Sequence, residues 1–292
     1  MNDKGRYRVT IHTDEQIVLM EKISECYLRE NMGQFWDLAE DLASEGSGYV
    51  YDKTDPDNDK KFRAYIKRRD EAEKLFNQAY KAAGGDGYRR EKANQAGDFF
   101  LTIRHAIWLE RPEPKPHDIN DAFPSTGWSE EQELHKCFKR DGDWFLEISR
   151  IQLKLLQDMS EHFMRERAGQ FCLLLDILVH ESPGYNMDKD DPDYEENLIK
   201  RNRNYEMANV MFEQGYRVSG AAGHPRKTKR MCMAYDFYDT IRHALWLEDP
   251  NPDNHLASGD PIHECEEVPL IEVESLGKKR KRGDEPYFSN SC

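Results

Sequence analysis

The chain has 292 residues, 38% of them hydrophobic, which is enough for two globular units with buried cores. Its 56 acidic residues outnumber the 42 lysines and arginines, so the formal net charge is −14. This charge disfavours direct nucleic-acid binding and favours a protein partner, a basic one in particular. The six cysteines form no CxxC pair, and the most apolar stretch, 171–179, is too short to span a bilayer. We therefore expect an intracellular protein with free thiols and no membrane segment.

The chain aligns with itself over most of its length. The phrase TIRHAIWLE at 102–110 returns as TIRHALWLE at 240–248, and Gly-Gln-Phe at 33–35 matches the same triplet at 169–171. Such extended self-similarity predicts a tandem duplication. The expected organisation is a first helical repeat at 1–116, a Pro-rich connector with a short helix at 117–142, a second repeat at 143–252 and a tail at 253–292.

Each copy is expected to begin with a short strand, at 7–12 or 144–148, because apolar and polar residues alternate there. Capping boxes follow at 13–16 (Thr and Gln) and at 149–152 (Ser and Gln), and each predicts the start of a helix. A brief strand therefore leads into a helix in both copies.

Three helices are expected in the first copy, and the second copy should repeat them. The opening helix should run to about Glu45 and bend near Gly33. The second begins at Asp-Pro-Asp, 55–57, where Asp caps and Pro suits the first helical position, and it ends at the glycines after Tyr80. The third contains the repeated phrase and ends at the prolines after Glu110. The predicted fold class is thus mainly α, a tandem three-helix unit with a strand before each copy.

The connector and the tail carry separate signals. A Ser-x-x-Gln box at 129–132 predicts a short helix over 129–140, and the sequence PLIEVES at 269–275 predicts a short strand. The end of the tail is expected to be disordered. It contains a basic run that an import receptor would recognise, which predicts a nuclear protein that is also present in the cytoplasm. The residues of this run are Lys278, Lys279, Arg280, Lys281 and Arg282.

The repeated phrase supplies the candidate binding residues. In a helix, His105 lies two turns from Asp98, and the second copy repeats this spacing, so each pair could form a polar site. Arg104 lies one turn from Trp108, close enough to stack on the indole. The competing interpretation, which we favour, is that these side chains pack a half-buried helix seam. The candidate residues are Arg104, His105, Trp108, Arg242, His243 and Trp246.

Motifs for catalysis, cofactors and metals are missing from the sequence. It contains no Gly-rich phosphate loop, no Gly-x-Ser-x-Gly elbow and no Glu-x-x-His pair. Aspartates alternate at 55–59 as in a calcium loop, but Lys60 and Ile66 stand where glycine and glutamate are required. We therefore expect no cofactor, no bound metal and no catalytic residue. Carboxylates that could complete a metal site with the histidines come from the first helix of each copy: Glu25, Glu30, Glu161 and Glu166.

These observations favour a non-enzymatic nuclear scaffold that binds a protein partner through two acidic helical copies. The copies differ at Trp36 against Cys172 and at 67–69 against 203–205, so we expect divided roles there. Self-association through the copies is a further prediction. The alternative function is a helical-bundle enzyme or an anion- or metal-binding protein. Its site would lie between the copies and contain Arg104, His105, Arg242 and His243.

Overall fold

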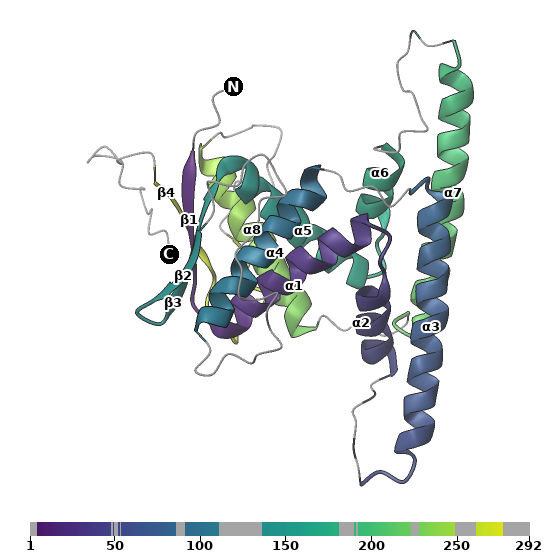
Figure 1. The fold of residues 1–292 in the computed structure, drawn as a ribbon, viewed down its shortest axis with the longest axis horizontal. Helices are drawn as coiled ribbons and strands as arrows, with labels where there is room; N and C mark the ends of the chain where they lie inside the picture. Colours follow the sequence, from purple (N-terminus) through teal and green to yellow (C-terminus); the bar gives the residue numbers. More distant parts are fainter. Residues whose placement is uncertain are drawn as a thin grey trace, which may run out of the picture.

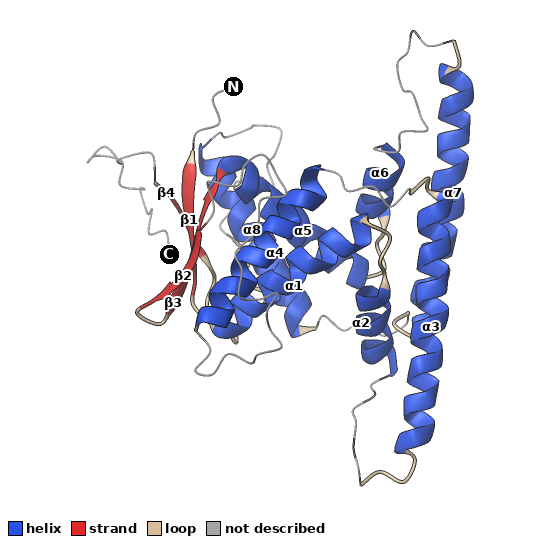
Figure 2. Ribbon diagram, viewed as in Figure 1, coloured by secondary structure: helices blue, strands red, loops and turns tan. Residues whose placement is uncertain are grey.

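A computed structural model describes residues 5–47, 49, 52, 54–85, 91–110, 136–180, 190, 192–222, 228–248 and 261–276. Over these residues the fold is mainly helical with a small sheet at one side (Figures 1 and 2). The elements in chain order are β1 (Arg6–Ile11), α1 (Asp14–Asn31), α2 (Trp36–Ser47), α3 (Asn58–Ala82), α4 (Glu91–Leu109), β2 (Lys136–Arg140), β3 (Asp143–Ser149), α5 (Arg150–Arg167), α6 (Cys172–His180), α7 (Tyr194–Ser219), α8 (Lys229–Glu248) and β4 (Glu272–Ser275).

The elements stack in layers that begin at the sheet (Figure 2). Helices α1, α4, α5 and α8 cover one face of the sheet, with α4 packed on α1, α1 on α5 and α5 on α8. Helices α2 and α6 form the next layer. The long helices α3 and α7 lie outermost, run in opposite directions and pack against each other (Figure 1).

The sheet is antiparallel, with the strand order β2-β3-β1-β4. Tyr7, Val9 and Ile11 of β1 are buried against the helices, as the alternating pattern of this stretch predicts. The strands expected at 7–12, 144–148 and within 269–275 are all present. Because β4 pairs with β1, the described chain brings one of its last segments beside its first strand.

Residues 136–140 do not form the helix that we expected there. They form β2, which pairs with β3 through a tight turn at Asp141 and Gly142, where φ is +55° and +97°. Cys137 is half-buried while its neighbours are exposed, so the segment follows the two-residue period of a strand. The Ser-Gln box that suggested a helix precedes β2 at 129–132, outside the described residues.

The first helix of each half is also shorter than expected. Both capping boxes are formed, but α1 ends at Asn31 and α2 starts anew at Trp36, and the second half is divided in the same way. Gly33 and Gly169 adopt φ of +76° and +77°, a left-handed conformation that ends a helix rather than bending it. Among the described residues, each half therefore has four helices after its strand rather than three: α1 to α4 follow β1, and α5 to α8 follow β3.

The boundaries of the other helices are close to the prediction. Helix α3 begins at Asn58, one turn later than expected, because Asp55 accepts the Asp57 N–H at 2.9 Å in a turn that precedes the helix. It ends at Ala82, just before the glycines. Helix α4 ends at Leu109, before the prolines.

Two hydrophobic cores hold the molecule together, and both draw on both halves. The first lies between the sheet and its four covering helices. The second lies between the outer layers, where Phe76 and Phe212 stack with ring centroids 5.6 Å apart and Phe171 lies 5.0 Å from Phe212. Neither half can bury its apolar side chains without the other.

The basic run Lys278–Arg282 and most of the connector lie outside the described residues. Among the described helices, none combines the length and the apolar character that crossing a membrane requires.

Candidate functional site

The two copies of the repeated phrase lie at opposite edges of the helix layer beneath the sheet. Helix α4 contacts edge strand β2, and α8 contacts edge strand β4, with α1 and α5 between them. Within each phrase the histidine ring stacks on the tryptophan: His105 and Trp108 have centroids 6.0 Å apart, and His243 and Trp246 6.2 Å. This placement favours two separate packing seams over one shared cleft, and a binding role for these residues stays a prediction.

The arginines of the phrase lie over aromatic rings one turn earlier in their helices. Arg104 lies 5.1 Å from the ring of Phe100, and Arg242 lies 5.2 Å from the ring of Tyr238. Arg242 also pairs with Asp239. The stack that we had expected joins Arg104 to Trp108, one turn later, so the observed partner is on the other side of the arginine.

The alternative interpretation of the sequence paired Asp236 with His243. The Asp236 carboxylate instead accepts the backbone N–H groups of Glu264, at 2.7 Å, and Cys265, at 3.1 Å. Burial raises the pKa of Asp236, and these backbone donors oppose that rise. Asp236 therefore fastens the segment before β4 to helix α8, a structural role.

A buried polar cluster lies where α1 and α5 cross. Glu30 and Glu166, one from each helix, are both buried and interact electrostatically with each other. Burial, together with the charge of Glu166, raises the pKa of Glu30 well above its usual range, and burial also raises the pKa of Glu166. The two carboxyl groups therefore titrate as one coupled pair, and burial favours the neutral form of each.

His162 belongs to the same cluster and is neutral at physiological pH. Burial lowers its pKa to about 4. Its Nδ1 lies 3.3 Å from Glu166 Oε1, and its ring meets Tyr27 edge-on at 5.2 Å. The sequence had suggested Glu30 and Glu166 as carboxylates, but it gave no reason to add His162, which has Cys26 at the aligned position in α1.

Arg167 places a buried positive charge beside this pair. Its Nη2 donates to Asp41 at 2.6 Å and to Cys26 Sγ at 3.4 Å, and its guanidinium lies 3.4 Å from the Phe163 ring centroid. The positive charge next to the two carboxyl groups is therefore that of Arg167, a side chain of the protein itself. Within the described residues, no three His, Cys, Asp or Glu side chains are arranged to hold a metal. The cluster is therefore a charge-paired network that joins α1, α2 and α5.

A cavity of about 360 Å³ lies on the other side of Asp41, between α1, α2 and α8. Three of its four charged side chains are paired: Lys22 binds Asp37 at 2.8 Å, Asp41 binds Arg167, and Glu15 binds Lys229 at 2.6 Å. The single remaining charge, on Arg230, gives little selectivity for an ionic ligand. The residues that line it are Glu15, Val18, Leu19, Lys22, Asp41, Arg230 and Met233.

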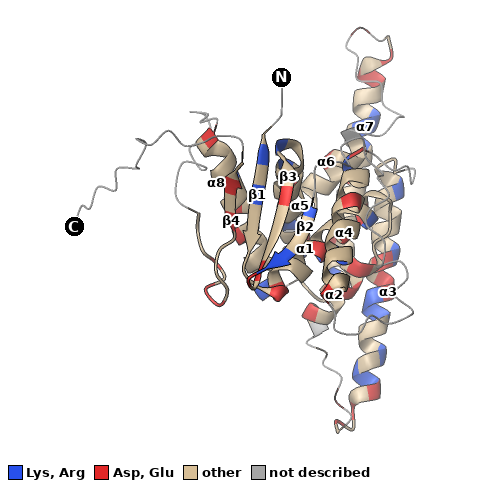
Figure 3. Ribbon diagram, turned by 60° about the vertical axis from the view of Figure 1, so that its left-hand side comes forward, with Lys and Arg blue, Asp and Glu red and all other residues tan. Residues whose placement is uncertain are grey.

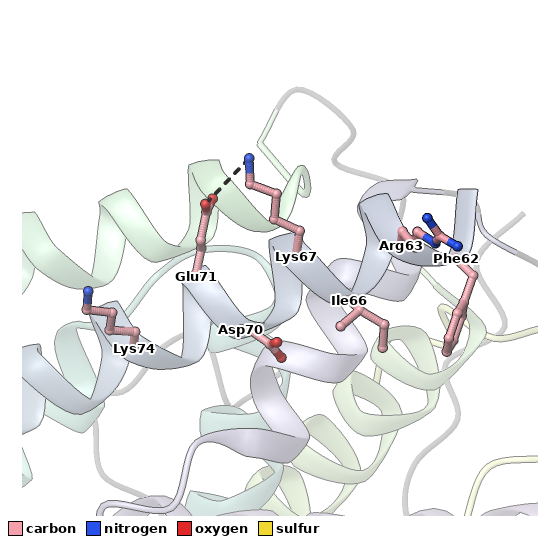
Figure 4. Close-up of a pocket in the computed structure, with 7 residues that line it drawn as sticks. All are labelled: Phe62, Arg63, Ile66, Lys67, Asp70, Glu71 and Lys74. Carbon is pink, nitrogen blue, oxygen red and sulfur yellow. Dashed lines mark ion pairs between the residues drawn. The ribbon is translucent and has the colours of Figure 1, made fainter. Parts of the chain in front are cut away.

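A shallow groove of about 550 Å³ runs along the outer surface of α3 (Figure 4). Phe62 lies at one end with 45% of its surface exposed, and an ion pair between Lys67 and Glu71, at 3.9 Å, lies farther along. Basic and acidic residues are interspersed on this helix (Figure 3). The groove is lined by Phe62, Arg63, Ile66, Lys67, Asp70, Glu71 and Lys74, which we name the α3 groove.

Aromatic rings gather at the Phe62 end of the α3 groove. Tyr49 stacks on Tyr65 at 5.4 Å and lies 5.8 Å from Phe62. Two turns farther along α3, the Arg69 guanidinium lies 5.6 Å from the ring of Trp36, which is 45% exposed. The second half has no such group at the positions aligned with Trp36, Phe62 and Tyr65, which are Cys172, Leu198 and Arg201.

The outer surface of α7 differs from that of α3. It exposes three apolar side chains, Ile199 at 69%, Val210 at 59% and Met207 at 42%. The aligned residues of α3 are all charged: Arg63, Lys74 and Glu71. Sequence comparison had pointed to 67–69 and 203–205 as the place where the halves diverge, and both segments lie on these two helices.

Comparison with known proteins adds no further assignment: no protein-family model, curated protein or solved structure matches this chain.

Proposed function

We propose that this protein is a non-enzymatic scaffold of the nucleus, built from a duplicated helical unit, which holds a protein partner in the α3 groove. The duplication is supported by the order of elements, which is the same from β1 to α4 as from β3 to α8. The matching capping boxes and the matching positive φ values of Gly33 and Gly169 support it as well. Nuclear entry rests on the basic run Lys278–Arg282.

The exposed aromatic end of the α3 groove is the observation that carries the proposal. Aromatic and arginine side chains dominate the binding energy of protein interfaces, and exposed ones in a contiguous group are uncommon elsewhere on a surface. Phe62 and Ile66 lie in one row along α3 and offer an apolar contact beside a row of charged side chains (Figure 4). An amphipathic helix is the partner element that such a groove along a helix accepts.

The charges of the α3 groove further describe the partner. Asp70 is paired with Arg69 at 2.7 Å, and Glu71 with Lys67. Within the part of the chain that the structure describes, Arg63 and Lys74 form no ion pair with a carboxylate. Carboxylates on a partner could therefore form ion pairs with these two residues. At this groove we therefore propose an acidic amphipathic helix, although the net charge of the whole chain favours a basic partner.

Affinity capture from nuclear extract tests the proposal with two matched variants of the full chain. We expect Phe62→Asp to lose the partner that the parent chain retains, because a buried carboxylate replaces the apolar contact. Leu247→Asp changes an apolar side chain that is exposed elsewhere, at 60%, and should retain it. Equal retention by both variants would refute the α3 groove as the binding surface.

Microscopy of the full chain tests the localisation. Replacing Lys278–Arg282 by alanine should abolish nuclear accumulation, because the import receptor binds the run through its charge. Unchanged accumulation would contradict this part of the proposal.

A further inference from the structure

We infer that two copies of this chain form a two-fold symmetric dimer in which their α7 helices pack antiparallel along one stripe of side chains. The stripe consists of Ile199, Arg203, Glu206 and Val210, and we name it the α7 stripe. It lies on a different helix from the α3 groove, so the inference does not depend on the proposed partner.

The α7 stripe points directly away from the core. Its members are spaced by four, three and four residues, which places them on a single helix face at 3.6 residues per turn. The same geometry places the buried residues of α7 on the opposite face. These are Ala208, Phe212, Gly215 and Ser219.

The side chains of the stripe are available for contact. Ile199 and Val210 are 69% and 59% exposed. Leaving two branched apolar side chains of one helix face in water is unfavourable in free energy. Arg203 and Glu206 are also exposed, and neither has an ion-pair partner among the residues that the structure describes. Met207, 42% exposed, lies beside Val210 and widens the apolar area.

The order of chemical types along the stripe is complementary to its own reverse. Read in one direction it is apolar, positive, negative, apolar. When a second α7 runs antiparallel with its Glu206 opposite Arg203, its Val210 lies opposite Ile199. Two-fold symmetry then repeats both contacts, which gives two ion pairs between two apolar pairs.

Other arrangements of two α7 helices are less favourable. A parallel alignment places Arg203 against Arg203 and Glu206 against Glu206, so like charges meet. The antiparallel alignment brings Glu213 opposite Glu196 at its ends, but Glu213 is already paired with Arg217 at 3.4 Å. The charges therefore favour the antiparallel direction, and they favour the α7 helix of a second copy as the partner.

Helix α3 cannot pair with itself in the same way. The aligned residues are Arg63, Lys67, Asp70 and Lys74, so the antiparallel alignment would place Arg63 opposite Lys74 at both ends. Repulsion between these two positive charges would stand where α7 has the contact between Ile199 and Val210. The second half thus presents the self-complementary stripe, and the first half supplies a matched control surface.

Sedimentation equilibrium of the full chain over a concentration series tests the inference. The parent should dimerise. Arg203→Glu and Glu206→Arg should each weaken the dimer by roughly 10- to 100-fold, because each creates two like-charge contacts. The double variant, which carries both substitutions, should regain most of the parent affinity, since the same two ion pairs re-form with their signs exchanged.

The control is the corresponding exchange on α3. Lys67→Glu, Asp70→Lys and their combination should leave the dimer unchanged. Circular dichroism should show native helix content in every variant, since all four positions are exposed. A parent that stays monomeric up to about 100 µM would overturn the inference. A dimer insensitive to both α7 reversals, or one that the double variant does not restore, would overturn it equally.

Discussion

Gly33 shows how one missing side chain separates two helices. A Cβ at this position would lie 2.6 Å from Tyr80 Cε1, and the backbone holds φ at +76°. Tyr80 has little freedom to move, because its hydroxyl donates to the Asn31 carbonyl at 3.3 Å. Both the conformation and the close approach therefore require glycine.

Gly33→Ala should lower the free energy of unfolding by about 2–4 kcal/mol, the sum of left-handed strain and displacement of the Tyr80 ring. Gly142→Ala separates the two contributions, because Gly142 has φ of +97° but no atom within 4 Å of an added Cβ. The control should lose only about 1–2 kcal/mol. Urea unfolding measures both, and equal losses would mean that the Tyr80 contact contributes nothing.

The raised pKa of Glu30 makes stability depend on pH. Because the folded-state pKa of Glu30 is raised above 4.5, its contribution to stability is fully present below about pH 4.5 and is lost as pH rises through the folded-state value. Glu30→Gln has no proton to lose. Relative to the parent, it should therefore become more stable as pH rises from 5 to 8.

Urea unfolding at each pH gives this comparison, with the exposed Glu195→Gln as control. Parallel curves for Glu30→Gln and the parent would show that the pKa of Glu30 is not raised in the folded state. His162 acts in the opposite direction: its pKa of about 4 means that stability is lost as pH falls from 6.5, by up to about 3 kcal/mol. The parent should therefore be most stable at mildly acidic pH.

At the scale of elements, Arg167 ties helix α5 to helix α2 through Asp41. The repeat aligns Arg167 with Asn31 and Asp41 with Ile177, and Asn31 Nδ2 donates to the Tyr27 carbonyl at 2.8 Å within its own helix. The ion pair between the two halves is therefore present once, and the aligned pair has a hydrogen bond within one helix instead.

Asp41→Ile alone should cost about 3–5 kcal/mol of unfolding free energy, because it leaves the Arg167 charge buried and uncompensated. Adding Arg167→Asn reproduces the residue types of the aligned pair, Asn31 and Ile177, and should recover most of that loss. Thermal and urea unfolding of the two single variants and the double variant give the coupling energy. Additive losses would show that the ion pair contributes no coupling.

Local signals explain which elements could be predicted. Capping boxes and alternation depend on neighbours in sequence, so the starts of α1 and α5 and the strands β1 and β3 were predicted correctly. Strand β2 was missed because its short alternation becomes informative only once β3 is known to pair with it. The break after α1 was mistaken for a bend, since the sequence does not show that Gly33 has a positive φ.

The candidate surfaces were harder to predict for a related reason. Ile199 and Val210 have the spacing of core residues, and only the packing of α7 on α3 shows that they face solvent. The buried cluster likewise needs the crossing of α1 and α5, which brings together Glu30, His162 and Glu166 from distant parts of the chain. Sequence divergence between the halves did identify the two helices concerned.

For the whole molecule, the two shared cores predict cooperative unfolding. Each core takes side chains from both halves, so neither half retains a core when the other unfolds. Calorimetry should show one transition, with a calorimetric enthalpy close to the van't Hoff value. Phe76→Ala in the outer core and Leu146→Ala in the core beneath the sheet should both move that transition, whereas two separate transitions would indicate independent halves.

The pairing of β4 with β1 has a consequence for biosynthesis. The ribosome completes β1 long before it reaches residue 272, and at 5–20 residues per second the interval is on the order of 10–50 s. For about the first half of that time Val9 and Ile11 lack both flanking strands, because β3 is complete only at residue 149, and β4 is missing until the end. A nascent chain in this state is a natural client for chaperones that shield apolar segments, and slow translation of the second half would prolong its dependence on them.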